Sequence, residues 1–357
     1  MARPLRPTTL ALAALPLWLS SCSVSHWNTA HDPRRTDVDR IVLGVTGAAV
    51  ELDRVELDRG SYAAVNEALS RVLIVVAHPD DELVAAGLTY LHGARRGGIV
   101  DVLTITDGQG GFKYASYAEA RTGVPYTDEK TGRELLPALR LEEQTAALEL
   151  LGARDLYRLD ELDHGYTRDR NEVLAENAGI WDLSRVRRCL DGLQRAKRYD
   201  LIVTLSPTDR THGHHQAATL LAVEAAARAE DGNVPVVLCC EVHAADDEGI
   251  GTPPAVLEDA LLARLADSVG PFVVDRTRPF GHADKMNLKS ICAVAVAQHL
   301  SQGTMLNYIG RGDLEEYWVF RVSPDDAAER CADFFERLEA GPRFAERDYA
   351  PTARPAR

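Results

Sequence analysis

The chain has 357 residues, of which 45% are hydrophobic and 26% are charged. This length is ample for one sizeable core, and we expect a single large domain rather than two independent ones. The formal net charge of −14 argues against a nucleic-acid partner, because binding to nucleic acid relies on a basic surface.

The N-terminal segment has the features of an export signal. Arg3 and Arg6 precede the apolar run 10–19, which is too short to span a bilayer comfortably. A Leu-Ser-Ser-Cys sequence ending at Cys22 follows and resembles the bacterial lipobox. The resemblance implies removal of residues 1–21, lipidation of Cys22, and anchoring of the exported protein to a membrane of the cell envelope. The alternative is an ordinary secretory signal in which Cys22 is incidental.

The rest of the chain divides by its hydrophobic pattern. Residues 23–67 carry many charges and no sustained period, and we interpret them as a tether and an N-terminal extension. The main domain is expected at 68–325. Segment 326–357 is expected to form a C-terminal helix and a disordered tail. The cysteines after Cys22 are scattered and lack CxxC spacing, which indicates neither a disulfide framework nor a sulfur-ligated zinc site.

Apolar runs of strand length alternate with segments of helical period through the main domain. The expected strands lie at 71–78, 99–108, 157–162, 199–207 and 234–242, and the expected helices at 81–98, 135–152 and 214–229. This alternation predicts an α/β fold of the Rossmann-like, doubly wound type, with a mainly parallel sheet and helices on both faces. Ligands bind such sheets at the carboxyl ends of the strands.

The first informative motif is AHPDDE at 77–82, directly after the first expected strand. Its adjacent carboxylates repel one another unless a cation or hydrogen-bond donors compensate. Histidine nitrogen and carboxylate oxygen are common zinc ligands, and Pro79 fixes a turn in which His78 and Asp81 converge while Asp80 points elsewhere. Capping of the next helix by a carboxylate is a weaker explanation, because it accounts for neither the histidine nor three acids in a row.

A second motif, DRTHGHH at 209–215, follows the expected strand 199–207. His212 and His215 are three positions apart and are expected to share a helical face, with His214 pointing away from both. Surface histidines on a polar loop are the alternative. Two such motifs at the ends of two strands favour one joint site.

The order strand–AHPDDE–helix, then strand–HxxH–helix, resembles the LmbE-like (PIG-L) family of zinc-dependent N-deacetylases. The similarity covers roughly residues 70–322. Further segments agree with the family's TxGxxG, RxxE, Leu-Gly and HxSQ motifs, namely 106–111, 140–143, 151–152 and 299–302.

Position by position, the resemblance implies that His78, Asp81 and His215 bind zinc. It also implies that Asp80 is the general base and that His212 stabilises the oxyanion. Zinc is the metal that the family implies, although sites of histidine and aspartate accept other divalent ions.

This chain departs from the family at one position. The second motif usually reads HxDH, and here His214 replaces its aspartate. That carboxylate could have oriented the neighbouring imidazole, so the change bears on the protonation state of His212. Asp209 is a candidate to replace it as the orienting group.

Several other residues are candidates for positioning or substrate binding. Glu82 is expected to orient a ligand or to brace the helix start. Arg140 either contacts a substrate hydroxyl or phosphate, or pairs with Glu143 on a helix surface. Asp163, with His164, follows another strand end and is expected to line the cleft, while Gln302 either reaches the metal site or packs.

The segment between the glycine turn and the Arg140 helix is rich in aromatic residues. They either form a lid that stacks on a sugar ring or pack the loop down, and they are Phe112, Tyr114, Tyr117 and Tyr126.

Together these features predict a metal-dependent hydrolase that removes an N-acetyl or other N-acyl group from an amino sugar, glycolipid or glycan. Zinc lowers the pKa of its water to about 7. Asp80 would accept a proton from this water, while His212 would hold the oxyanion and protonate the departing amine. The alternatives are a metallo-amidase acting on a non-sugar metabolite and a catalytically degraded glycan-binding lipoprotein.

Overall fold

The computed structural model describes residues 38–45, 48–175, 177–230, 232–263, 269–280, 284–303, 305 and 312–340. The expected export signal, Cys22 and the expected tail beyond Ala340 lie outside the described residues. Within the described part of the chain, no helix has both the length and the apolar character needed to cross a membrane.

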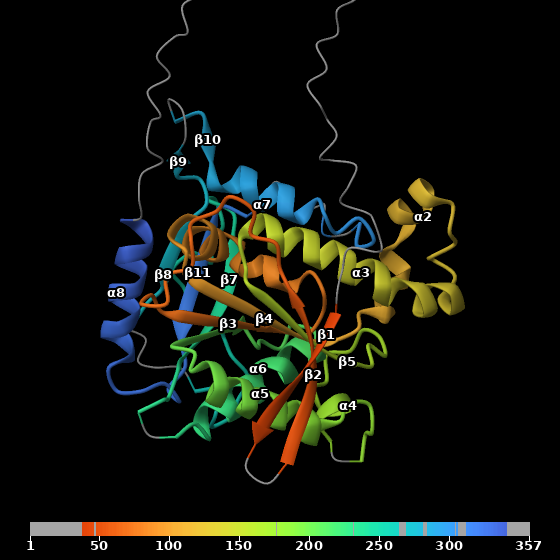
Figure 1. Ribbon diagram of the computed structural model, residues 1–357, viewed down its shortest axis with the longest axis horizontal. Helices are drawn as coiled ribbons and strands as arrows, with labels where there is room; N and C mark the ends of the chain where they lie inside the picture. Colours follow the sequence, from red (N-terminus) through yellow and green to blue (C-terminus); the bar gives the residue numbers. More distant parts are fainter. Residues whose placement is uncertain are drawn as a thin grey trace, which may run out of the picture. The chain divides into compact units, whose positions relative to one another are not determined.

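A nine-stranded sheet forms the centre of the fold, in the order β1-β2-β5-β4-β3-β6-β7-β11-β8 (Figure 1). Its central strands are parallel: β5 (Asp155–Glu161), β4 (Ile99–Thr106), β3 (Arg71–Val76), β6 (Leu201–Leu205) and β7 (Val236–His243). The outer strands join antiparallel: β1 (Val38–Val45), β2 (Ala48–Glu56), β11 (Leu314–Val319) and β8 (Phe272–Asp275). A separate two-stranded ribbon pairs β9 (Pro279–Phe280) with β10 (Met286–Asn287). The predicted α/β fold with a parallel central sheet is confirmed.

The interpretation of residues 23–67 as an extension outside the domain is wrong for residues 38–56. These residues form the β1–β2 hairpin, and β2 pairs with β5 at the edge of the main sheet. The physical reason is burial of one face of the hairpin, because Leu52 is fully buried and Val50 nearly so in the same part of the core.

Helices cover both faces of the sheet (Figure 1). One face carries α1 (Ala86–Thr89), α3 (Glu129–Leu151), α7 (Leu288–Val296) and α8 (Ala327–Glu339), and the other carries α4 (Asn171–Leu174), α5 (Leu183–Lys197) and α6 (Gly213–Ala227). The short helix α2 (Ser116–Thr122) lies between β4 and α3 in the chain. The expected helix 81–98 is a run of a 3₁₀ turn (Asp81–Ala85), α1 and a π turn (Tyr90–Arg95).

Strand β3 shows how the sheet divides the core. Val72, Ile74 and Val76 pack with the helices of one face, while Leu73 and Val75 pack with those of the other. All of these side chains are buried, as expected for a parallel strand covered on both sides. This burial holds β3 rigid directly before the AHPDDE motif.

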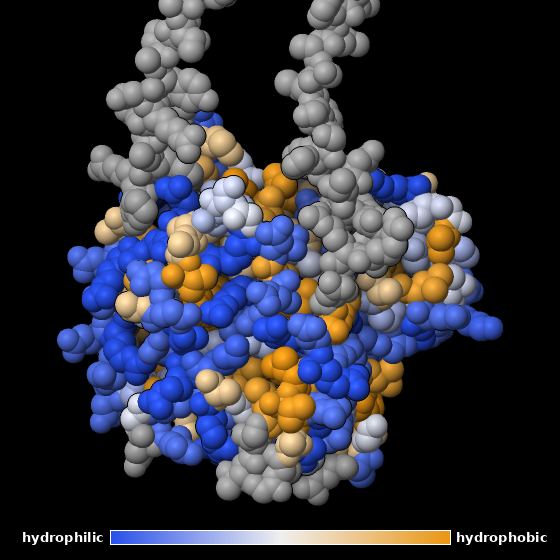
Figure 2. All heavy atoms as spheres, in the orientation of Figure 1, coloured by the Kyte–Doolittle hydropathy of each residue, from blue (hydrophilic) through white to orange (hydrophobic). Residues whose placement is uncertain are grey.

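The surface is mainly hydrophilic on the face shown in Figure 2, with scattered hydrophobic patches. The cysteines in the described part of the chain are buried: Cys189, Cys239, Cys240, Cys292 and Cys331.

Candidate metal centre

Side chains from the two motifs meet at the carboxyl-end edge of the sheet. His78 Nδ1 lies 3.1 Å from His215 Nε2 and 3.2 Å from Asp81 Oδ2. Asp81 Oδ1 lies 3.2 Å from His215 Nε2. Ligand atoms on tetrahedral zinc, with bonds of about 2.1 Å, lie about 3.4 Å apart. The two imidazoles and one carboxylate therefore match zinc in both chemistry and spacing.

The carboxylate of Asp81 is held in its ionised form, which suits the binding of a cation. Burial opposes ionisation of Asp81, but His215 and His78 outweigh it and hold the pKa of Asp81 well below its usual value. The backbone N–H of His78 also donates to Asp81 Oδ2 over 2.8 Å. Asp81 is therefore held as an anion that faces both imidazoles.

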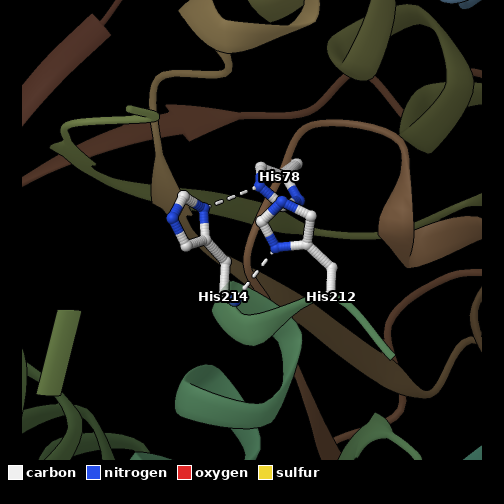
Figure 3. Close-up of side chains that lie close together, drawn as sticks. All are labelled: His78, His212 and His214. Atoms are coloured by element: carbon white, nitrogen blue, oxygen red, sulfur yellow. Dashed lines mark hydrogen bonds between the residues drawn. The ribbon is translucent and has the colours of Figure 1, made fainter. Parts of the chain in front are cut away.

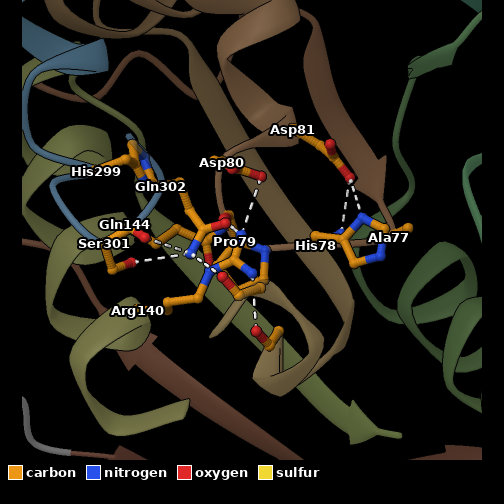
Figure 4. A network of polar contacts seen from close by, with 12 residues as sticks. Ala77, His78, Pro79, Asp80, Asp81, Arg140, Gln144, His299, Ser301 and Gln302 are labelled. Carbon is orange, nitrogen blue, oxygen red and sulfur yellow. Dashed lines mark hydrogen bonds and ion pairs between the residues drawn. The ribbon is translucent and has the colours of Figure 1, made fainter. Parts of the chain in front are cut away.

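The loop that follows β3 is strained at Asp80, which has a φ of 130°, a conformation that side chains other than glycine rarely adopt. The backbone N–H of Asp80 donates to Glu82 Oε2 over 2.9 Å. Arg140 from α3 donates to the carbonyl of Pro79 and forms a 3.2 Å ion pair with Asp80 Oδ1 (Figure 4). These contacts hold the strained turn and aim the carboxylate of Asp80.

Asp80 lines the same cavity as the three metal-binding candidates but is not one of them. Burial raises the pKa of Asp80 to about 6, although Arg140 opposes the shift. A carboxylate with a pKa near neutrality is suited to accepting a proton.

Glu82 lies behind this loop, fully buried, as expected for a residue that braces the site. Besides the Asp80 amide, it accepts hydrogen bonds from Gln144 Nε2 over 2.8 Å and from His299 Nε2 over 3.1 Å. Glu82 therefore ties the first motif to α3 and to the segment after α7.

The interpretation of Arg140 as a helix-surface residue paired with Glu143 is wrong. Its guanidinium is buried, so it is not a surface residue, and it binds the Pro79 and Gly108 carbonyls together with Asp80. Glu143 instead accepts from the Ser301 amide and hydroxyl, over 2.7 and 2.6 Å. Arg140 does line the cavity, so contact with a substrate stays a prediction.

The structure corrects the expected orientation of the second motif. His212 is the N-cap of α6 and does not lie on its helical face; its Nδ1 accepts from the His214 amide over 3.0 Å (Figure 3). His214 does not point away from the site. It is fully buried, and its Nδ1 lies 3.0 Å from His78 Nε2. Helix α6 begins at Gly213, so His212 precedes the helix as its N-cap instead of lying on a helical face with His215.

The hydrogen bond from the His214 amide to His212 Nδ1 also shows that Asp209 does not orient the His212 ring. This residue is exposed in the turn before α6, whereas the Nδ1 atom of His212 is already engaged by the backbone. Burial first, and then His78 and His215, lowers the pKa of His212 to about 3. His212 is therefore neutral, with its hydrogen on Nε2.

The candidate ligands line a cavity of about 290 Å³. Asp163, as predicted, lines it and accepts from the Gly110 amide over 3.0 Å. Gln302 also lines it, and its Nε2 donates to the Ser301 carbonyl over 2.8 Å. A larger hollow of about 450 Å³ lies beside Ser70 at the start of β3, at the other edge of the sheet, and contains none of the candidate ligands.

The aromatic residues of this segment are partly packed into the protein and partly exposed. Phe112 is buried against Leu136 and closes the loop on α3. Tyr114 is 45% exposed and lines the cavity. Tyr126 packs beside Phe112, and Tyr117 is 50% exposed.

Comparison with known proteins agrees with this geometry. The family model described as GlcNAc-PI de-N-acetylase (PIG-L) matches residues 73–226, a range that contains all three candidate ligands.

Residues 73–226 are thus similar to the PIG-L family.

Curated relatives also match parts of the chain. It is 39% identical over 88 residues to a 1D-myo-inositol 2-acetamido-2-deoxy-alpha-D-glucopyranoside deacetylase of Mycobacterium sp. (strain KMS), covering 25% of this chain and 26% of the relative. It is 32% identical over 168 residues to the deacetylase of the same name from Mycolicibacterium gilvum (strain PYR-GCK), covering 44% and 55%. The chain thus spans between about a quarter and about half of the length of these relatives.

A solved structure also matches part of this chain at low similarity. The 4-carboxy-2-hydroxymuconate hydratase GalB from Pseudomonas putida KT2440 is 20% identical, with a TM-score of 0.44 over 70% of this chain and 96% of the hydratase.

Sequence reasoning missed two residues at the mouth of the cavity. Tyr166 is 63% exposed, and its ring centre lies 4.9 Å from that of His212. Arg133 from α3 donates to the carbonyls of Asp163 and His164 over 3.1 and 3.2 Å, and so holds the loop after β5. The available signal was the position of this loop at a third strand end, where ligand-binding residues are expected.

Proposed function

We propose that the protein is a zinc-dependent N-deacetylase that acts on an N-acetylated amino sugar. The observation that carries the proposal is the convergence of His78, Asp81 and His215 beside Asp80, a carboxylate that is positioned to accept a proton but lies outside the ligand set. The PIG-L match and the names of the relatives support amide cleavage on a sugar.

When bound, zinc would polarise the acyl carbonyl and acidify water at the site. The residues of the chain supply the remaining chemistry. Asp80 accepts the proton of the attacking water. His212 lines the same cavity, and its Nε2–H donates a hydrogen bond to the carbonyl oxygen as negative charge develops there. A neutral His212 has no spare proton for the departing amine, so the amine receives the proton that Asp80 took from the water.

The lining of the cavity supports a sugar as the substrate. Tyr114 and Tyr166 place exposed aromatic rings at its mouth, and such rings combine an apolar face with a polar hydroxyl. Lys113 and Arg133 line the same opening, so polar and charged groups of a glycan or glycolipid also have partners there.

The test is acetate release from a panel of N-acetylglucosamine glycans and glycolipids, with N-acetylated amino acids as the non-sugar arm. We expect one acetate and one free amine per cleaved sugar, loss of turnover with a chelator, and recovery on addition of zinc. Release from the amino acids alone would replace the proposal with a non-sugar amidase. Glycan binding without release would replace it with a binding protein.

We also propose that the protein is an envelope lipoprotein anchored through Cys22. The support is the sequence Leu-Ser-Ser-Cys after the apolar run 10–19. Expression of the full chain and of Cys22→Ser, followed by fractionation, is the test. We expect the natural chain in the membrane fraction with a lipid-modified N-terminus, and the variant released from it. An unmodified Cys22 in a secreted protein would overturn the proposal.

A further inference from the structure

His214, the residue that departs from the PIG-L motif, begins a line of hydrogen bonds that leads away from the metal centre. His78 Nε2 lies 3.0 Å from His214 Nδ1, and His214 Nε2 lies 2.9 Å from His164 Nδ1. His164 Nε2 lies 3.0 Å from Glu172 Oε2. The line runs from fully buried His214 to Glu172, whose side chain is 49% exposed.

The carboxylate at the outer end sets the direction of the whole line. An ionised carboxylate only accepts hydrogen bonds, and a neutral imidazole has one N–H and one acceptor nitrogen. His164 must therefore donate from Nε2 to Glu172 and accept at Nδ1. His214 then donates from Nε2 and accepts at Nδ1, so that His78 must donate from Nε2.

The direction of these hydrogen bonds determines which nitrogen of His78 can bind a metal ion. With its hydrogen on Nε2, His78 has a lone pair on Nδ1, the atom that faces Asp81 and His215 at 3.2 and 3.1 Å. A hydrogen bond from the second nitrogen of a ligand histidine fixes its tautomer and its ring orientation.

We propose that His214, His164 and Glu172 form a series of hydrogen bonds that holds His78 in the tautomer whose Nδ1 can bind a metal ion. They are positioning residues, and the inference rests on the metal centre of the proposed function. It also explains how the chain tolerates histidine at position 214. Histidine Nδ1 and aspartate Oδ1 are both bonded to Cγ, so either side chain can reach His78, but histidine needs Glu172 to define which nitrogen accepts.

Asp163 is the nearest acceptor that could compete with His214 for the hydrogen on His78 Nε2, but it lies too far from this atom. Its Oδ1 lies 3.9 Å from His78 Nε2, beyond hydrogen-bond range. Asp163 is instead engaged through Oδ2 by the amide of Gly110.

The outer part of the line is anchored at several points. Arg133 donates to the carbonyl of His164 over 3.2 Å, and the amide of Gly213 donates to the carbonyl of Thr167 over 2.8 Å. Val173, next to Glu172, is buried in the core under α6. The loop that carries His164 and Glu172 is thereby fixed to α3 and to the start of α6.

The experiment measures the zinc dissociation constant of the purified protein by competition with a chromophoric chelator, at about pH 8, where an unperturbed histidine is neutral. We expect Glu172→Ala to weaken zinc binding about 10-fold, as changes to the partners of ligand histidines typically do. Glu134→Ala is the matched control, because it removes one exposed carboxylate from α3, next in sequence to Arg133 of the cavity lining. The visible spectrum of the cobalt-substituted protein should change in Glu172→Ala and not in the control.

Two double variants test whether Glu172 acts through the series of hydrogen bonds or only through its negative charge. In a His164→Phe background, Glu172→Ala should change zinc affinity by no more than about twofold, since the connection is already broken. In a His214→Asp background, Glu172→Ala should again change the zinc affinity little, because the new carboxylate accepts a hydrogen bond from His78 directly. His164 is partly exposed, so the first pair tests the proposal even where His214→Asp does not fold.

Unchanged zinc affinity in Glu172→Ala, or the same loss in all backgrounds, would overturn the inference and leave the metal centre intact. Failure of the natural protein to bind zinc would instead overturn the metal centre itself.

Discussion

Asp80 is buried beside Arg140 and faces the cavity that holds the metal ligands. Asp80→Asn preserves the size and the hydrogen-bonding outline of the side chain but removes its ability to take a proton. We expect the rate of acetate release to fall by about a hundred- to ten-thousand-fold, with the zinc content unchanged by elemental analysis. Asp246→Asn, an exposed carboxylate in the loop after β7, is the control. Full activity in Asp80→Asn would exclude it as the base.

His212 has two functions that one substitution can separate. Its Nδ1 caps α6, and its Nε2 is the proposed donor to the oxyanion. In His212→Asn, the amide oxygen replaces Nδ1 as the cap acceptor, and asparagine is a favourable cap residue. We expect kcat to fall by an amount equivalent to about 3 kcal/mol, while the midpoint of thermal unfolding stays close to that of the natural protein. A large loss of stability would show that capping is the main function of this residue.

At the scale of elements, the β1–β2 hairpin extends the sheet beyond β5. Leu52 on β2 is fully buried in the core, whereas Val42 on β1 is 61% exposed. We expect Leu52→Ala to lower the free energy of unfolding by about 2–5 kcal/mol. Val42→Ala should change it by less than about 0.5 kcal/mol. Chemical denaturation of both variants provides the measurement, and equal effects would mean that the hairpin is not part of the cooperative fold.

The same hairpin shows why the central strands were predictable and the edge was not. Strands such as β3 and β4 are buried on both faces and appear in the sequence as continuous apolar runs. Strand β2 alternates buried Val50 and Leu52 with charged residues, which is a weaker signal than a continuous apolar run. Sequence alone therefore located the parallel core and the two motifs at its edge.

The sequence predicted which residues meet at the site, but not the directions of all their side chains or their distant partners. The motifs themselves identified the residues that converge, because they follow neighbouring parallel strands. The directions of His212 and His214 depended on where α6 begins, because His212 precedes the helix as its N-cap and His214 lies in its first turn. The partners of Asp80 and Glu82 come from α3 and from the segment around His299, and contacts over such sequence separations cannot be read from local patterns.

For the whole molecule, a buried acid at the edge opposite the metal centre links stability to pH. Asp101 on β4 is 1% exposed, and its Oδ2 accepts from the hydroxyl of Tyr199 over 2.6 Å. Burial, followed by the charge of Asp155, raises the pKa of Asp101 to about 6, against the hydrogen bond from Tyr199. The folded state therefore binds this proton more tightly than the unfolded chain does.

The sign of the effect follows from this difference. Stability from the protonated Asp101 is fully present below about pH 4, the unfolded pKa, and is lost as the pH rises through about 6, for a total of about 3 kcal/mol. Asp101→Asn keeps an acceptor for Tyr199 and stays neutral at every pH. We expect this variant to unfold at a higher temperature than the natural protein at pH 8, with the difference nearly absent at pH 4. Thermal unfolding across this range provides the measurement, and a constant difference at all pH values would show that Asp101 does not change its charge.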